Sequence, residues 1–263
     1  MTKERASIAD AQRIVVKIGS SSLTNPDGHL SDDALTALVV TLATAMSSGA
    51  KVVLVTSGAV AAGLGPLNLS ERPQDLATVQ AAASVGQGAL IAHYSHAFAQ
   101  HHHHVGQVLL TSEDAENGPR YANAQRTLTR MLELGVIPIV NENDTVTTEE
   151  LTFGDNDRLA ALVAQLLSAD ALILLTDVDG LHTASPRSEG AERISFVAHM
   201  DDVAHVPVSP YGSAVGTGGM VTKLTAARLA TNAGIPTVIT ESGNLFAALR
   251  GQDVGTYFAP VAR

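Results

Sequence analysis

The chain has no cysteine, no long apolar run and few lysines. Without cysteine in its 263 residues it can form no disulfide framework and use no thiolate in a reaction. No uninterrupted apolar run approaches the ~18 residues of a membrane span, and the polar start "MTKERASIADAQR" lacks the apolar segment of a secretory signal. These absences predict a soluble, cytoplasmic protein that does not enter a membrane.

Positive charge is also scarce. There are 16 basic residues against 26 acidic ones, a formal net charge of −10. A nucleic acid or an anionic membrane surface requires a basic stripe, so neither is expected as a partner, whereas small anionic substrates are not excluded. Only four residues are lysines, and two of them, Lys17 and Lys223, stand in glycine-containing strand or loop segments.

Short β-branched runs alternate with helix-length segments along the whole chain, which is typical of βα units around a parallel sheet covered on both faces. The fold class is therefore α/β, and the length allows either one large domain or two lobes. The expected strands are "RIVVKIG" at 13, "KVVLVTSG" at 51, "VGQVLLT" at 105, "VIPIVNEND" at 136, "ALILLTDVDG" at 171 and "IPTVITES" at 235.

Helix boundaries are also marked in the sequence. Ser31 is the expected N-cap of a helix that Gly49 ends, and Pro119 opens another that Gly135 closes. The segment 183–220, rich in Pro, Gly and Ser, is expected to be irregular structure around a site.

The first two expected strands each end in residues suited to bind an anion. Lys17 precedes a glycine and three serines in "VVKIGSSSLT", and Ser57 stands at the turn of "VTSGAVAAG" before a helix of small residues. In open α/β sheets ligands bind at the carboxyl ends of the strands, and helix N-termini favour anions. The alternative for Lys17 is a lysine on an edge strand whose ammonium reaches solvent.

The segment "GTGGMVTK" at 216–223 has the composition of a phosphate-binding loop but is not a Walker motif. A Walker loop needs glycine directly before its lysine and Ser or Thr directly after it, whereas Thr222 precedes Lys223 and Leu224 follows. The glycines still suit a loop whose backbone approaches a nucleotide, and Lys223 opens a helix.

Acidic and amide residues gather at three further element ends. Asp144 lies in "VNENDTV", Asn156 and Asp157 in "FGDNDRL", and Thr176 and Asp177 in "LLTDVDGL". Each group has a structural alternative, because acidic residues also cap helices and form turns. Carboxylates here could orient the lysines, hold Mg²⁺ through water or bind a substrate ammonium.

Two lysines over glycine-rich backbone indicate phosphoryl transfer, which depends on positioning and on neutralising charge. No histidine stands at these junctions as a general base, which an alcohol acceptor would need. A carboxylate acceptor, with an ordinary pKa of about 4.3, is already ionised at neutral pH. The sequence therefore favours a kinase that forms an acyl phosphate, with Asp157 as an organiser of lysines and metal. The segment "VTSGA" also lacks the G-x-S-x-G elbow of a serine hydrolase.

The same motifs resemble the amino acid kinase family. "VVKIGSSSLT", "VTSGAVAAG", "VGQVLLT", "NAQRTL", "IVNENDTV", "FGDNDRLAAL", "LLTDVDGL" and "GTGGMVTKL" occur in this order across essentially the whole chain. Related branches have a KFGGTS-like or KLSGE-like first strand. "KIGSSSLT" together with "NENDTV" and "GDND" is similar to the branch that phosphorylates glutamate.

This resemblance implies a three-layer αβα sandwich and ATP-dependent phosphorylation of the γ-carboxylate of L-glutamate, the first step of proline biosynthesis, with Mg²⁺. It implies one domain over residues 1–263, with a glutamate-binding lobe to about 168 and an ATP-binding lobe from about 169. Feedback inhibition by proline and assembly into a homo-oligomer are further implications.

The resemblance also implies a role for each motif residue. Lys17 and Lys223 would contact the transferring phosphate, and Asp157 would align them. Glutamate would be held by Ser57, Asp144 and Asn156. Nucleotide contacts would come from Lys17, Thr176, Asp177, Thr217, Gly218, Gly219, Met220, Val221, Thr222 and Lys223. The metal ligands stay unassigned.

The chain departs from the family pattern at two places. A YxxDPR motif reads "LHTASPR" here, with His182 and Ser185. Many bacterial members continue into a C-terminal PUA domain, which is not expected in this sequence ending at Arg263, either because the protein is a naturally short form or because the sequence is part of a longer one. A histidine-rich segment, "HYSHAFAQHHHH" at 93–104, is expected to be a solvated helix end, with a metal site at His93, His96 and His101–His104 as the alternative. The rival functions are a kinase for another small acid, such as N-acetylglutamate or carbamate, and a non-catalytic sensor.

Overall fold

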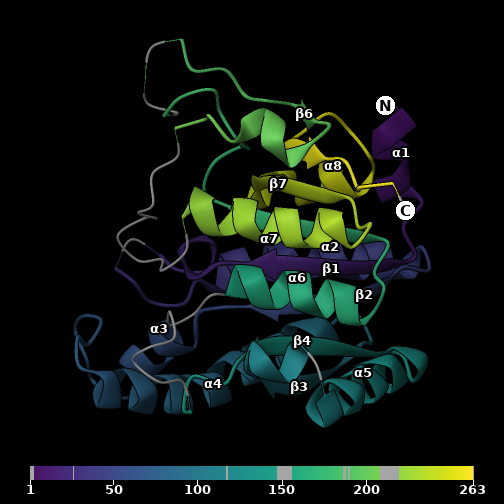
Figure 1. Cartoon of the computed structure of the whole chain (residues 1–263). Coiled ribbons are helices and arrows are strands. Elements are labelled where there is room, and N and C mark those ends of the chain that lie inside the picture. Colours follow the sequence, from purple (N-terminus) through teal and green to yellow (C-terminus); the bar gives the residue numbers. More distant parts are fainter. Residues whose placement is uncertain are drawn as a thin grey trace.

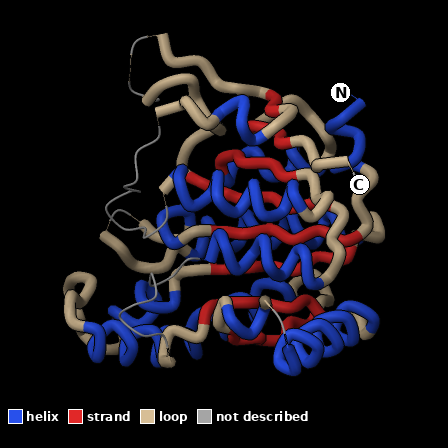
Figure 2. Tube along the Cα trace, in the orientation of Figure 1, coloured by secondary structure: helices blue, strands red, loops and turns tan. Residues whose placement is uncertain are grey.

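The computed structural model describes residues 3–25, 27–116, 118–146, 156–185, 188, 190–207 and 219–262. Thr217 and Gly218, expected in the nucleotide loop, lie outside the described residues. The described helices and strands form three layers, with the sheet between two layers of helices, as Figures 1 and 2 show. The expectation of an αβα sandwich is confirmed.

The eight described strands form one sheet in the order β3-β4-β2-β1-β5-β7-β8-β6. All neighbours are parallel except β7 and β8. Residues before 169 supply β3, β4, β2 and β1, and later residues supply the other four. The strands are β1 (Arg13–Ile18), β2 (Lys51–Thr56), β3 (His104–Leu110), β4 (Val136–Glu142), β5 (Ala171–Thr176), β6 (Phe196–Val197), β7 (Thr237–Glu241) and β8 (Thr256–Phe258).

The six expected strands are confirmed, whereas β6 and β8 were not predicted. These two strands have two and three residues, too few to show a periodic pattern. β6 falls within the segment expected to be irregular, so part of that segment joins the sheet.

Two groups of helices cover the two faces of the sheet. One apolar core joins the sheet to α5 (Gly118–Glu133), α6 (Asn156–Leu166) and α7 (Met220–Asn232). The other joins it to α1 (Lys3–Ala9), α2 (Asp32–Ser47), α4 (Leu76–Ala99) and α8 (Leu245–Leu249), while α3 (Ala59–Leu64) packs on α4. Four 3₁₀ helices complete the described elements: Ser20–Ser22, Glu113–Ala115, Met200–Val203 and Ser242–Asn244.

The predicted helix signals are present at the predicted places. The Ser31 side chain accepts a hydrogen bond from the Ala34 amide at 3.3 Å and caps α2, and Gly49, with φ of 100°, ends its last turn. α5 begins at Gly118, one residue before the expected Pro119, and Gly135 follows it with φ of 73°.

Strand alternation on β1 decides where Lys17 points. Ile14, Val16 and Ile18 belong to the core under α2 and α4, whereas Val15 belongs to the core under α6 and α7. Since side chains alternate between the faces of a strand, Lys17 points to the same side as Val15. Figure 1 shows α6 and α7 side by side over this face, beginning near the carboxyl end of β1.

None of the described helices combines the length and the apolar character that crossing a membrane requires.

Candidate active site

A charged cluster lies where β1 ends and where α6 and α7 begin. Lys17 Nζ lies 2.7 Å from Asp157 Oδ1, and Lys223 Nζ lies 3.2 Å from Asp157 Oδ2. All three residues are at least 96% buried, and Thr222 donates a further hydrogen bond to Asp157 Oδ2 at 2.7 Å. Residues some two hundred positions apart in the chain thus meet on one carboxylate.

The two lysines fix the ionisation of Asp157. Burial alone would raise the pKa of its carboxyl, but Lys17 and Lys223 outweigh burial and lower it to about 2. The pKa of Lys223 is lowered by burial and by Lys17, against the opposing effect of Asp157.

The cluster has two ammonium groups against one carboxylate and so carries a net charge of +1 in a buried place. A buried unpaired charge is costly, and an anion between the lysines would compensate it. Because Lys17 is buried and β1 lies between β2 and β5, the alternative of an exposed lysine on an edge strand is wrong. Gly19 keeps the space beside it clear, because a Cβ there would lie 3.4 Å from Lys17 Nζ.

A second, neutral network begins at the residue before Asp157. Asn156 Nδ2 donates to Ser57 Oγ at 3.0 Å and to Asn141 Oδ1 at 3.1 Å. The backbone amide of Glu142 donates to Asn156 Oδ1 at 3.2 Å and to Asn141 Oδ1 at 2.9 Å. Asn141 in turn donates to Gln87 Oε1 at 2.7 Å. The structure thus brings Ser57 and Asn156 together, as expected.

Among the described residues, this network leaves the Ser57 hydroxyl hydrogen available to a ligand. Both Nδ2 hydrogens of Asn156 are used inside the protein, and Ser57 Oγ accepts one of them. The remaining Ser57 hydrogen can donate to an acceptor such as a carboxylate oxygen. Ser57 is held at the end of β2 by its amide, which donates to Ile18 O at 3.1 Å, and by Gly58, whose φ of 101° makes the turn into α3.

Asp144 lies two residues after β4 and differs from Asp157 in its electrostatics. Burial raises the pKa of its carboxyl to about 6, against the opposing effect of Arg72. Within the described part of the chain, its side chain is not hydrogen-bonded to Ser57 or Asn156, so the expected group of three is only partly assembled. Because burial disfavours the ionised form of this carboxyl, a ligand's cation beside it would stabilise that form.

The expected nucleotide residues lie at the end of β5 and at the start of α7. Thr176 and Glu241 are register partners at the carboxyl ends of β5 and β7, and Thr176 Oγ1 donates to Asp177 Oδ1 at 3.1 Å. Asp177 opposes the lowering of the pKa of the Lys223 ammonium. Gly219 is the N-cap of α7, whose first turn contains Met220, Val221, Thr222 and Lys223.

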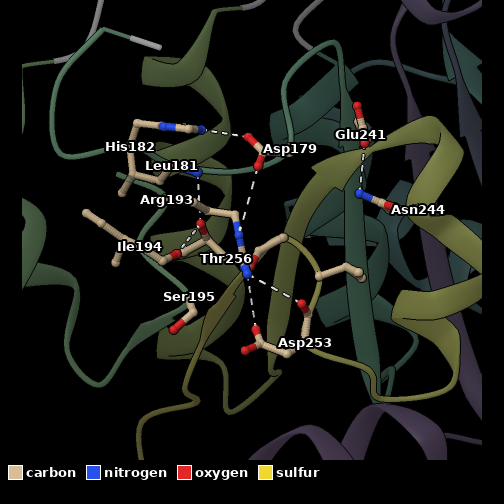
Figure 3. A network of polar contacts seen from close by, with 12 residues as sticks. Asp179, Leu181, His182, Arg193, Ile194, Ser195, Glu241, Asn244, Asp253 and Thr256 are labelled. Carbon is tan, nitrogen blue, oxygen red and sulfur yellow. Dashed lines mark hydrogen bonds and ion pairs between the residues drawn. The ribbon is translucent and has the colours of Figure 1, made fainter. Parts of the chain in front are cut away.

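The segment after Asp177 is tied to β8 by polar contacts (Figure 3). His182 Nε2 lies 2.6 Å from Asp179 Oδ1, and Arg193 Nε lies 4.0 Å from Asp179 Oδ2. The Leu181 amide donates to Thr256 Oγ1 at 2.8 Å. His182, one of the two departures in "LHTASPR", is therefore engaged with Asp179.

The described residues contain no group of three or more His, Asp or Glu side chains that could hold a metal ion. Both oxygens of Asp157 face lysines. Mg²⁺ commonly keeps several waters and is held by substrate phosphates with one or two carboxylates, which suits this site with its exposed Asp177. In the histidine-rich segment, α4 ends at Ala99, and His93 Nδ1 contacts Asp32 Oδ1 at 3.0 Å.

The fold and the buried lysine pair are those expected of a phosphotransferase, and comparison with known proteins identifies the family. The amino acid kinase family model matches residues 12–241, and the chain belongs to this family. Two solved structures share its fold: UMP kinase from Bacillus anthracis (TM-score 0.63, 15% identity, 96% of this chain and 97% of that one) and carbamate kinase from Giardia lamblia (TM-score 0.69, 14% identity, 96% and 99%).

More similar relatives are named glutamate 5-kinase. That of Bifidobacterium longum subsp. infantis is 55% identical over 258 residues, which are 98% of this chain and 68% of the relative. That of Streptomyces avermitilis is 54% identical over 265 residues, 100% of this chain and 71% of the relative.

Proposed function

We propose that this chain transfers the γ-phosphoryl group of ATP to the side-chain carboxylate of L-glutamate, forming L-glutamyl 5-phosphate in the first step of proline biosynthesis. The observation that carries the proposal is the buried cluster of Lys17, Asp157 and Lys223 beside the neutral network of Ser57 and Asn156. The relatives of 54–55% identity over nearly the whole chain support glutamate as the acceptor.

In this proposal the two lysines act on the group in transfer. Charge spreads over the equatorial oxygens of the phosphoryl group in the transition state, and two fixed ammonium groups would stabilise it there. Asp157 holds both ammonium groups in place through its two oxygens, and its low pKa keeps it ionised. It is therefore not a base, and a carboxylate acceptor needs none.

The acceptor would lie over the neutral network. The Ser57 hydroxyl would donate to a carboxylate of L-glutamate, while Asn156 sets the position of that hydroxyl. Asp144 would pair with the substrate ammonium, which would offset its burial.

The nucleotide would extend from the lysines over the end of β5. Thr176, Asp177 and the segment from Thr217 to Lys223 are the proposed contacts, and the amino end of α7 favours phosphate. Mg²⁺ would neutralise phosphate charge and arrive with the nucleotide. The ATP-binding and glutamate-binding lobes would then be the two halves of the sheet that meet at β1 and β5. A cytoplasmic location, a homo-oligomer and inhibition by proline remain proposals from the resemblance.

The test is an acceptor assay in which hydroxylamine traps the acyl phosphate. Purified protein is incubated with ATP and Mg²⁺ and with L-glutamate, L-aspartate, N-acetyl-L-glutamate or carbamate in turn. L-Glutamate should give a hydroxamate, and N-acetyl-L-glutamate should not, because acetylation removes the cation that Asp144 would bind. A Lys223→Ala variant is the negative control.

Three results are distinguishable. A hydroxamate from N-acetyl-L-glutamate, or ATP consumption with carbamate, in place of L-glutamate would replace the proposed acceptor. No reaction with any acid, together with binding of ATP or L-glutamate, would favour the sensor. Equal turnover by Lys223→Ala and the unaltered protein would remove the lysine pair from the mechanism.

A further inference from the structure

The neutral network reaches a glutamine on α4, a helix that carries none of the residues predicted to bind glutamate or the nucleotide. Gln87 is 92% buried, and its Oε1 accepts the 2.7 Å hydrogen bond from Asn141 Nδ2. Its Nε2 is also buried and has no hydrogen-bond partner among the described residues. The amide of Gln87 is thus used by this network as an acceptor.

The direction of every hydrogen bond in this network is set by one backbone group. The Glu142 amide can only donate, so the atoms it meets on Asn141 and Asn156 are the side-chain oxygens. The Nδ2 of Asn156 therefore faces Ser57 Oγ, and the Nδ2 of Asn141 faces Gln87. Because Asn141 donates at this point, residue 87 must supply a hydrogen-bond acceptor.

The position of Gln87 is itself fixed by close helix packing. A Cβ on Gly86 would lie 1.8 Å from Ala59 O, and a Cβ on Gly63 would lie 2.0 Å from Ala82 O, so the backbones of α3 and α4 touch. Gln87 directly follows this crossing. Its amide is thus anchored to the helix that begins after Gly58, beside Ser57.

α4 makes a second buried polar contact seven residues later. The Tyr94 hydroxyl lies 2.8 Å from Thr56 Oγ1, and Thr56 directly precedes Ser57. A spacing of seven places Gln87 and Tyr94 on one face of the helix. One face of α4 thus reaches the strand end that carries Ser57 and also the network that holds Asn156.

We propose that Gln87 is a positioning residue for the acceptor substrate: by accepting from Asn141 it fixes Asn156, and through Asn156 it sets the Ser57 hydroxyl that would bind L-glutamate. The inference rests on the proposed function, because the ligand is taken to be L-glutamate. Gln87 acts within the neutral network and not on the lysine cluster, so it should affect acceptor binding and leave the nucleotide unaffected.

The first experiment measures KM for L-glutamate and for ATP in a Gln87→Met variant. Methionine keeps the length of the side chain and replaces the amide oxygen with a thioether sulfur, which is a much weaker acceptor. KM for L-glutamate should rise about tenfold, the effect of one lost hydrogen bond, while KM for ATP stays within about twofold. Gln125→Met is the control. Gln125 donates a 2.8 Å hydrogen bond to Leu166 O and takes no part in this network. This control variant should change neither value.

Two further variants separate positioning from packing. Gln87→Glu keeps an acceptor oxygen and should hold KM for L-glutamate within about threefold, because a buried carboxyl is kept neutral by its raised pKa. In an Asn156→Ala background, Gln87→Met should add less than about twofold, because Gln87 acts through Asn156. Should circular dichroism show that Gln87→Met does not fold, Gln87→Ala replaces it with the same expectations.

The outcomes separate this inference from the proposed function. No hydroxamate from L-glutamate with the unaltered protein would overturn the proposed function and this inference with it. An active protein in which Gln87→Met leaves KM for L-glutamate within about twofold would overturn only the role of Gln87. Additive effects of Gln87→Met and Asn156→Ala would also overturn only the role of Gln87. Equal rises in KM for L-glutamate and KM for ATP would do so as well.

Discussion

Two neighbouring residues at the start of α6 belong to two different networks. Asn156 joins a chain of neutral amides and a hydroxyl, whereas Asp157 joins two ammonium groups. Both are buried, with 3% and 1% of their surface exposed. One helix start thus divides the site into a neutral part and a charged part.

The two parts differ in how they can act on a ligand. Charges in a buried place act over several ångströms and stabilise whatever negative charge develops between them. Neutral hydrogen bonds depend on distance and angle, so they select shape and fix position. Under the proposed function, we therefore expect the charged part to set the rate of transfer and the neutral part to recognise the acceptor.

Loss of one lysine from the charged part should have the largest effect. Lys17→Ala should lower kcat at least about a hundredfold, the range for a lost electrostatic stabiliser of a transition state. Steady-state kinetics with the exposed Lys51→Ala as control would measure it. An effect confined to KM for ATP would mean that Lys17 binds only the ground state of the nucleotide.

Removing the central carboxylate should destabilise the folded protein. Asp157→Asn leaves two buried ammonium groups unpaired, and breaking a buried ion pair costs about 3–5 kcal/mol. Thermal unfolding at pH 7 should show a lower Tm, and the exposed Asp33→Asn serves as control. An unchanged Tm would show that the lysines lose their charge or move apart without cost.

The same carboxylate predicts an acid effect on stability. The folded-state pKa of Asp157 is depressed to about 2 from a usual 3.8, so its contribution is present above about pH 4 and lost as the pH falls towards 2. Asp157→Asn should therefore show a smaller loss of stability over this range than the unaltered protein.

Asp144, which lies outside the neutral network, should make acceptor binding pH-dependent. With a pKa of about 6, its carboxylate is largely protonated at pH 5 and ionised at pH 7.5, so KM for L-glutamate should be about tenfold higher at pH 5. The substrate side-chain carboxylate, with an ordinary pKa of about 4.3, stays mostly ionised over this range. Asp144→Asn should abolish the difference, and a persistent difference would assign it to another group.

Asp144 also tests whether the site trades stability for binding. Because its folded-state pKa is raised, the folded protein binds this proton more tightly than the unfolded chain, and stability falls as the pH rises from about 4 to 6. Asp144→Asn should therefore raise Tm at pH 7.5 while raising KM for L-glutamate. A lower Tm would mean that the carboxylate is stabilised by partners inside the protein.

The charged part was predictable from the sequence because its residues follow simple placement rules. Strand alternation puts Lys17 on the face of Val15, and parallel strands bring their carboxyl ends to one edge. Asp157 and Lys223 each stand in the first turn of a helix on that face. The strand pattern and helix starts therefore predict the edge and Asp157 as an organiser of the lysines, while the resemblance added that Asp157 aligns Lys17 and Lys223 as a pair.

The neutral part was predictable only at its motif residues. Asn141 lies in the expected strand "VIPIVNEND" but had no predicted role, and Gln87 was not among the predicted site residues. Gln87 lies inside a helical segment of small and apolar residues, and its partner is 54 positions away. A lone buried glutamine beside a glycine is a weak local signal, because the α3 and α4 crossing that orients it forms only in the tertiary structure.

The most direct test is a crossed kinetic comparison of Asn156→Ala and Lys17→Ala under identical conditions. Asn156→Ala should raise KM for L-glutamate at least about tenfold with KM for ATP nearly unchanged. Lys17→Ala should lower kcat at least about a hundredfold with KM for L-glutamate nearly unchanged. If both variants change the same kinetic constant, the division of this site into a charged transfer part and a neutral recognition part is wrong.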